Sequence, residues 1–350
     1  MKRRVISAAG AAVAIAAFAP SAAGAATHTV FAGADGVVRN APKQYTPNAF
    51  FRRTVTIHVG DSVRWQFRGF HTVTIPARGR ARPPLVILDA SKPVTGQVDA
   101  AGVPFWFNGQ PSPVFNPLVA APQGGTTYTG RRLVNSGLPQ GNRPKPFTVR
   151  FTRAGVFPYF CSVHPGMRGT VIVRAASRRV PSEAANRAER NREIAATARH
   201  GRRTNAKPAT HPGTVEVGRS PAGDRFSINA FFPANTTVKV GSTVTFTMAG
   251  ESTQEIHTVT FRPANVADIP FVTPQGAINP VAAFPSDPPP TLPPYTGINH
   301  GNGFLNSGLL DNVPATPQPN TTRVTFTTPG TFHYECTVHE GMEGTVTVTP

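Results

Sequence analysis

The sequence is poor in cysteine and methionine, with two and four among 350 residues. Two cysteines allow one disulfide at most, which excludes a disulfide-rich scaffold. After the N-terminal region, no stretch is long and apolar enough for a membrane-spanning helix. Charged residues are also scarce at 15%, while hydrophobic residues reach 39%, which excludes a wholly disordered polyelectrolyte. With 37 prolines and 32 glycines, the composition argues against a long helical bundle and predicts two folded domains.

The N-terminus is typical of a secretory signal peptide. Basic residues at 2–4 precede a short apolar stretch over 5–19, and small residues stand at 23–26. We therefore expect residues 1–26 to be removed and the mature protein to be secreted, in the periplasm or another extracytoplasmic compartment.

Five short blocks occur in the same order in both halves of the chain. They pair Asn48-Ala49-Phe50-Phe51 with Asn229-Ala230-Phe231-Phe232, Gly60-Asp61-Ser62-Val63 with Gly241-Ser242-Thr243-Val244, His71-Thr72-Val73 with His257-Thr258-Val259, Asn135-Ser136-Gly137-Leu138 with Asn306-Ser307-Gly308-Leu309, and Cys161-Ser162-Val163-His164-Pro165-Gly166-Met167 with Cys336-Thr337-Val338-His339-Glu340-Gly341-Met342. Five blocks in one order indicate a duplicated domain, over residues 27–174 and 214–350.

Each repeat has the hydrophobic pattern of an all-β unit. Apolar residues alternate with polar ones over 55–59, 63–67 and 244–248, and glycine and proline interrupt the runs. Such strands, buried on one face, predict a two-sheet sandwich in each repeat.

The segment between the repeats, residues 175–213, is basic, with nine basic and three acidic residues. Residues 182–199 are rich in alanine, arginine and glutamate, and Ser182 is a suitable N-cap, so we expect a solvated helix. We favour a plain spacer, with an arm that binds anionic surfaces as the alternative.

The pattern Cys-x2-His-x2-Met occurs twice and carries the chemistry. A thiolate, an imidazole and a thioether within seven residues converge if the segment is a tight loop between strands. The earlier histidine of each repeat shares a strand face with apolar residues and supplies a further ligand. The candidate ligands are His71, Cys161, His164 and Met167 in the first repeat, and His257, Cys336, His339 and Met342 in the second. Cysteines in matching contexts favour two thiolate sites over one disulfide.

The donor types select the metal. Structural and catalytic zinc sites use cysteine, histidine and carboxylate, and methionine is foreign to them. Two histidines and one cysteine with a weak axial methionine form the ligand set of a type 1, or blue, copper centre, which transfers electrons. The sequence therefore predicts two type 1 copper sites.

With these motifs, both repeats resemble the cupredoxins, with the ligand-loop spacing of plastocyanin and amicyanin. The resemblance covers most of residues 27–174 and 214–350. It implies Greek-key β-sandwiches with copper near one end, and a partly exposed loop histidine (His164, His339) as the electron port.

Two features depart from the small cupredoxins. Many members have asparagine directly after the first histidine, where it helps to secure the cysteine loop, whereas Thr72 and Thr258 stand here. The stretches from the first histidine to the cysteine are also much longer, and include Phe105-Trp106-Phe107 and Pro288-Pro289-Pro290. These insertions are either functional covers or tolerated surface loops.

An electron carrier is favoured over an enzyme. Multicopper oxidases and copper nitrite reductases need His-x-His pairs and histidines flanking the cysteine. None of the ten histidines here lies two positions from another. Phe160 and Ser162 flank one cysteine, and Glu335 and Thr337 the other. A copper buffer or delivery protein, which would use the same ligands, remains the alternative. The remaining histidines are expected at surface or strand positions: His28, His58, His200, His211, His300 and His333.

The formal net charge of +18 is unevenly distributed. Residues 27–174 carry a net charge of +14 and residues 214–350 a net charge of −5. A basic unit joined to an acidic one argues against nucleic acid as the partner. It predicts redox partner proteins of opposite charge for the two domains.

Overall fold

The computed structural model describes residues 24–350 except 39, 142–143, 210, 222, 224, 249–254, 264–267 and 313–317. The predicted signal peptide over 1–26 lies outside the described residues, apart from its last three. Among the described helices, none has the length and apolar character needed to cross a membrane.

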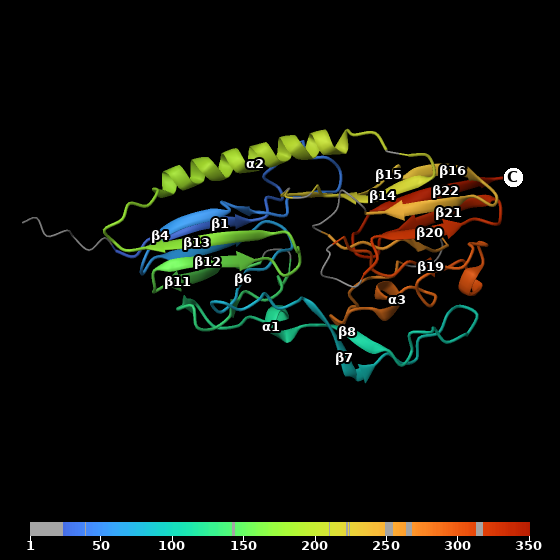
Figure 1. Cartoon of the computed structure of the whole chain (residues 1–350), viewed down its shortest axis with the longest axis horizontal. Coiled ribbons are helices and arrows are strands. Elements are labelled where there is room, and N and C mark those ends of the chain that lie inside the picture. Colours follow the sequence, from blue (N-terminus) through green and yellow to red (C-terminus); the bar gives the residue numbers. More distant parts are fainter. Residues whose placement is uncertain are drawn as a thin grey trace, which may run out of the picture.

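The N-terminal half forms a sandwich of two five-stranded sheets (Figure 1). One sheet contains, in spatial order, β3 (Phe50–Phe51), β1 (Thr27–Ala32), β5 (Ser62–Phe67), β11 (Phe147–Phe151) and β9 (Thr127–Tyr128). The other contains β10 (Val134–Asn135), β6 (Thr74–Ile75), β12 (Gly155–Phe160), β13 (Arg168–Arg174) and β4 (Thr54–His58). Trp65 and Tyr159 are fully buried and lie edge to face between the sheets, with ring centroids 5.2 Å apart.

The C-terminal half forms a second sandwich with a corresponding strand order. One sheet contains, in spatial order, β2 (Tyr45–Thr46), β15 (Ser227–Phe232), β14 (Thr214–Arg219), β17 (Thr243–Thr247) and β20 (Thr321–Thr325). The other contains β16 (Asn235–Lys239), β22 (Glu343–Thr349), β21 (Gly330–Glu335), β18 (Thr260–Phe261) and β19 (Leu305–Asn306). Both sandwiches pair their first strand in parallel with a later one, β1 with β5 and β14 with β17. The predicted all-β fold with two sandwich units is confirmed. An unexpected feature is β2, which comes from the N-terminal half but pairs with β15.

The period-2 patterns form these strands because one face of each strand is buried. In β5, Val63 and Trp65 are fully buried while Arg64 between them is exposed. In β13 and β22 the burial alternates along all seven residues. Burial of alternate apolar side chains fixes the register, because a slip of one residue would expose them all.

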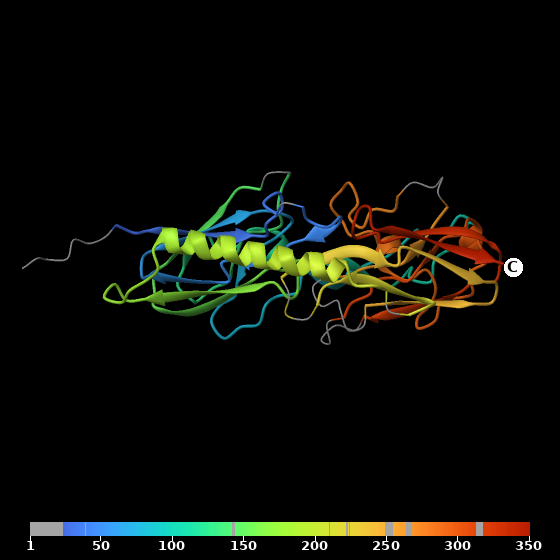
Figure 2. The ribbon, with the colours of Figure 1, turned by 90° about the horizontal axis from the view of Figure 1, so that it is seen from above.

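The helix expected over 182–199 is α2 (Glu183–Asn205), which lies along the molecule (Figures 1 and 2), but one of its faces is packed rather than solvated. Ser182 caps it as predicted, its side chain accepting from the Ala185 N–H. The helix packs against β1, β3 and β15, strands of both sandwiches. Ile194 is buried in a cluster with Phe51, and the Arg190 guanidinium lies 4.3 Å from the centre of the Phe31 ring.

The long insertions of the two halves pack against each other. Hairpin β7 (Val86–Pro93) and β8 (Pro111–Phe115) and the short helices α1 (Pro117–Ala120), α3 (Pro280–Ala283) and η1 (Asn299–Gly301) belong to them. Phe105 and Phe107 are buried with Phe304 of the second half, and Trp106 Nε1 donates to the Pro285 carbonyl (2.9 Å). His300 lies between Asp99 (3.0 Å) and Asp287 (3.2 Å). The insertions are therefore contacts between the halves rather than free surface loops.

Candidate metal centres

The first centre gathers His71, Cys161 and His164 at one end of the N-terminal sandwich. His71 precedes β6, whereas Cys161 and His164 lie in the turn between β12 and β13. The two Nδ1 atoms are 3.0 Å apart, and Cys161 Sγ lies 3.4 Å from His164 Nδ1. All three residues are buried. Their donor atoms lie within 4.8 Å of one another, a spacing at which one ion can contact all three.

The second centre repeats this geometry with His257, Cys336 and His339. Their Nδ1 atoms are 3.1 Å apart, and Cys336 Sγ lies 3.7 Å from His257 Nδ1 and 3.6 Å from His339 Nδ1. The donors again lie within 4.8 Å of one another. The structure thus brings together six of the eight predicted ligands as two triads.

The two methionines close the ligand turns. Met167 and Met342 are each 1% exposed and lie in the cores of the two sandwiches. The Cys161 N–H donates to the Met167 carbonyl (2.9 Å), and the Met167 N–H donates to the His164 carbonyl (3.0 Å). The same backbone bonds close the second turn. These bonds account for the Cys-x2-His-x2-Met spacing, while an axial role for the thioethers stays a prediction.

Threonine performs the task that the resemblance assigned to asparagine. The Thr72 N–H points at Cys161 Sγ (3.4 Å), and the Thr72 hydroxyl accepts from the Ser162 N–H (2.7 Å). The Thr258 N–H likewise lies 3.3 Å from Cys336 Sγ, and its hydroxyl accepts from the Thr337 N–H (2.9 Å). Each threonine therefore donates to the sulfur and holds the residue after the cysteine.

The repeated Asn-Ser-Gly-Leu block supports the same loop. The Ser136 hydroxyl accepts from the Val73 N–H (2.9 Å), and Asn135 Oδ1 accepts from the Thr74 hydroxyl (2.8 Å). That hydroxyl also contacts Ser162 Oγ (2.8 Å). Asn306 and Ser307 make the equivalent bonds to Thr260 and Val259 in the second sandwich. Part of each insertion thus lies beside a centre.

Two glycines that the sequence analysis missed make room for the first histidine of each centre. Gly33 and Gly218 have φ of +80° and +75°, and a Cβ on either would collide with Nε2 of His71 or His257. Both Nε2 atoms are buried and have no hydrogen-bond partner among the described residues. The backbone at Gly33 and Gly218 therefore packs against the Nε2 side of the His71 and His257 rings, while Nδ1 of each ring faces the other donors. An alignment of β1 with β14 would have revealed the pair.

The electrostatics prepare both centres for a cation. Burial would raise the pKa of each cysteine thiol, but the neighbouring histidines lower it well below its usual value. Burial would lower the pKa of His164, but the charges of Glu255 and Cys161 raise it. Deprotonated sulfur beside two imidazoles fits a soft or borderline metal ion, which binds by displacing protons.

The surroundings of the two cysteines differ in charge. Arg82 Nη1 donates to the carbonyls of Cys161 (3.2 Å) and Pro165 (3.1 Å). At the second centre, Glu335 precedes the cysteine and pairs with Arg262 (2.7 Å). The first centre thus has a cation beside its sulfur-bearing loop.

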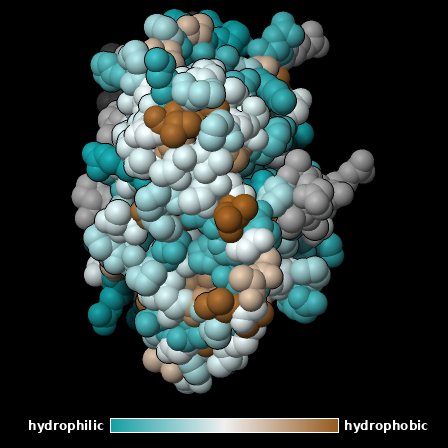
Figure 3. Space-filling view, turned by 90° about the vertical axis from the view of Figure 1, so that its right-hand side faces the viewer, coloured by the Kyte–Doolittle hydropathy of each residue, from teal (hydrophilic) through white to brown (hydrophobic). Residues whose placement is uncertain are grey.

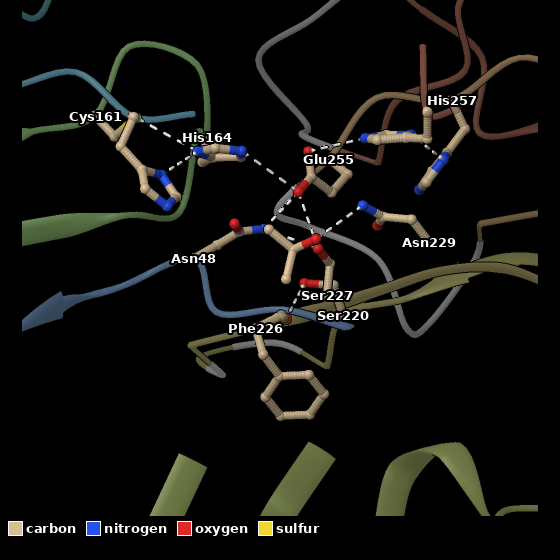
Figure 4. A network of polar contacts seen from close by, with 12 residues as sticks. Asn48, Cys161, His164, Ser220, Phe226, Ser227, Asn229, Glu255 and His257 are labelled. Carbon is tan, nitrogen blue, oxygen red and sulfur yellow. Dashed lines mark hydrogen bonds and ion pairs between the residues drawn. The ribbon is translucent and has the colours of Figure 1, made fainter. Parts of the chain in front are cut away.

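The two centres face each other across Glu255 (Figure 4). The carboxylate oxygens lie 3.5 Å from Nε2 of His164 and 3.5 Å from Nε2 of His339. Burial would raise the pKa of Glu255, but the charges of His164, His339 and His257 hold it well below its usual range. The side chain of His164 is only 7% exposed and that of His339 16%. The expectation of a partly exposed port is therefore wrong for His164, which is buried with Glu255 of the second half against its outer nitrogen.

Comparison with family models and with curated proteins gives no match. Among solved structures, the oxidised state of an amicyanin mutant is 16% identical to this chain with a TM-score of 0.22. The match covers 43% of this chain and 83% of the amicyanin chain. The oxidised form of plastocyanin from Dryopteris crassirhizoma is 25% identical with a TM-score of 0.22, covering 39% of this chain and 99% of its own. TM-scores this low carry no weight of their own, so the strand orders and the donor geometry define the fold and the candidate centres.

Proposed function

We propose that this protein is an exported electron carrier of the cupredoxin type with two type 1 copper sites, one in each sandwich. The ligands would be His71, Cys161, His164 and Met167, and His257, Cys336, His339 and Met342. The proposal rests above all on the two buried triads, in which two imidazole Nδ1 atoms and one sulfur lie within 4.8 Å. Adding the methionine of each turn completes a donor set that suits copper rather than zinc.

The chain's own residues would keep the donors fixed and dry. Copper, when bound, supplies a one-electron couple between Cu(I) and Cu(II). The N–H groups of Thr72 and Thr258 aim at the sulfurs and hold their orientation. Gly33 and Gly218 hold the first histidines in place through close contact. Since the donors are already converged and buried, little has to move when an electron arrives or leaves.

The two units would be duplicated copies of one module, and each would have its own redox partner. The five repeated blocks support residues 27–174 and 214–350 as copies of one module. Their net charges of +14 and −5 support redox partners of opposite charge. Because the loop histidines face inward, such partners would dock on outer surfaces. On the end face of the second sandwich (Figure 3), apolar residues lie singly among polar ones, which suits brief electrostatic encounters.

Copper titration of three matched proteins tests the proposal. The wild-type chain should bind two equivalents of Cu(II), each with an intense thiolate-to-copper absorption band and a type 1 EPR signal. Cys161→Ser and Cys336→Ser should each keep one of the two signals, since each removes one thiolate and leaves the other triad intact. A wild-type protein that binds Cu(II) without the charge-transfer band would refute the assignment.

Voltammetry separates the carrier from the alternative functions. A carrier should cycle reversibly with copper retained in both oxidation states. A buffer or delivery protein would instead release copper when a chelator is added to the reduced protein. An oxidase or nitrite reductase would consume O2 or nitrite in the presence of an electron donor, which we do not expect.

A further inference from the structure

Glu255 is a buried carboxylate, 5% exposed, that touches both centres (Figure 4). Its Oε1 lies 3.5 Å from His164 Nε2, and its Oε2 lies 3.5 Å from His339 Nε2. In each triad the Nδ1 atom of the same ring faces the other donors. One carboxylate therefore contacts the outer nitrogen of a candidate ligand in each centre, and each oxygen serves one ring.

Residues of both halves hold this carboxylate in place. Asn48 Nδ2 donates to Oε1 of Glu255 and to Ser227 Oγ (2.8 Å), and Ser227 Oγ donates to the same Oε1 (2.9 Å). Asn48 lies just before β3 and Ser227 begins β15. At the position matching Glu255 in the first repeat, two residues before His71, stands Gly69. Among the described residues, Glu255 is therefore a bridging carboxylate that the first repeat does not duplicate at the matching position.

A carboxylate in this position acts on both imidazoles at once. Burying a carboxylate is costly unless cationic and hydrogen-bonding partners surround it. An imidazole that binds a cation through Nδ1 carries more positive charge at its Nε2–H. A carboxylate that accepts from this N–H fixes the ring and strengthens it as a ligand. Here the two rings compete for one negative charge, so the charge on one centre affects the other.

We propose that Glu255 is a shared positioning residue that couples the two copper centres of the proposed electron carrier, on which this inference rests. Its negative charge stabilises Cu(II) over Cu(I) at both centres through the loop histidines. Each centre still gains or loses one electron with an external partner, and Glu255 changes neither its bonds nor its protons. Removal of this one carboxylate should therefore change two reduction potentials together.

Glu255→Gln tests the coupling, because glutamine keeps the shape and removes the charge. We expect the preference for Cu(II) over Cu(I) to fall roughly tenfold at both centres, which raises each potential by about 59 mV for one electron. The affinity for Cu(II), measured by competition with a chelator, should fall by roughly 10- to 100-fold at both. Glu340→Gln is the matched control, since that exposed carboxylate is next to His339 and far in sequence from the first centre. It should leave the first potential unchanged.

The outcomes distinguish this inference from the proposed function. Potentials that stay at wild-type values in Glu255→Gln, or a shift at the second centre alone, would overturn the coupling. Absence of blue copper in the wild-type protein would instead refute the proposed function. If Glu255→Gln does not fold, Glu255→Asp serves, since its shorter side chain keeps the charge but cannot span both rings. In Glu255→Asp the reduction potential should then rise at the one centre whose histidine has lost the carboxylate. Two reduction potentials at wild-type values would overturn the inference.

Discussion

Replacement of Thr72 by valine tests whether its hydroxyl holds the first cysteine loop. Valine has nearly the same shape but cannot accept from the Ser162 N–H, which the hydroxyl now binds at 2.7 Å. Thr72 is fully buried and Ser162 is 7% exposed, so water cannot easily replace the lost acceptor. An unsatisfied buried donor costs about 1–3 kcal/mol. We therefore expect Thr72→Val to lower the free energy of unfolding by that amount.

The assay is thermal and urea unfolding of the metal-free protein, followed by copper titration. Each kcal/mol corresponds to roughly 2–4 °C in Tm for a domain of 150–250 residues. Thr72→Ser keeps the hydroxyl and should retain most of the stability, and Thr258→Val should reproduce the loss in the second sandwich. In Thr72→Val the absorption band of the first copper should shift while that of the second stays. A valine variant as stable as the wild type, or no more affected than the serine variant, would contradict this role.

Three further predictions concern other contacts of the structure. The hydrogen bond to Asp287 raises the pKa of His300. The stability that protonated His300 contributes is therefore complete below about pH 6.5 and is lost as the pH rises through the folded-state pKa. Urea unfolding at several pH values should show this loss of stability, and His300→Gln should abolish the pH dependence. Arg82 favours the reduced, less positive first centre, so Arg82→Gln should lower the potential of that centre alone in voltammetry, and an equal shift at both would contradict the assignment. Gly33→Ala should abolish copper binding at the first centre by colliding with His71, whereas Gly36→Ala, with a φ of +72° but open space around it, should bind copper normally in the same titration.

The sequence was sufficient to predict the strands and the two His/Cys/His groups, because both follow from local patterns. The alternation of apolar and polar residues predicted which face of each strand is buried. The spacing of Cys-x2-His-x2-Met fits a turn closed by backbone hydrogen bonds from Cys161 to Met167 and from Met167 to His164. The N-cap at Ser182 followed from equally local chemistry.

The contacts between the two halves could not be predicted in the same way. Besides Ile194 and Ala198, helix α2 buries asparagine, arginine, threonine and glycine, so its packing face leaves no hydrophobic period. Strand β2 joins the sheet of the other half, which no local pattern indicates. Glu255 has no counterpart in the first repeat, so comparison of the repeats passes over it. Its position two residues before His257 was the available signal.

The two copper centres and their coupling are tested together by loading the wild-type protein and Glu255→Gln with Cu(II) and recording absorption, EPR and voltammetry on both. We expect two blue copper centres in each protein, with both reduction potentials higher in the variant. Wild-type protein with fewer than two such centres, or a variant whose two potentials match those of the wild type, would contradict a pair of copper centres joined through one carboxylate.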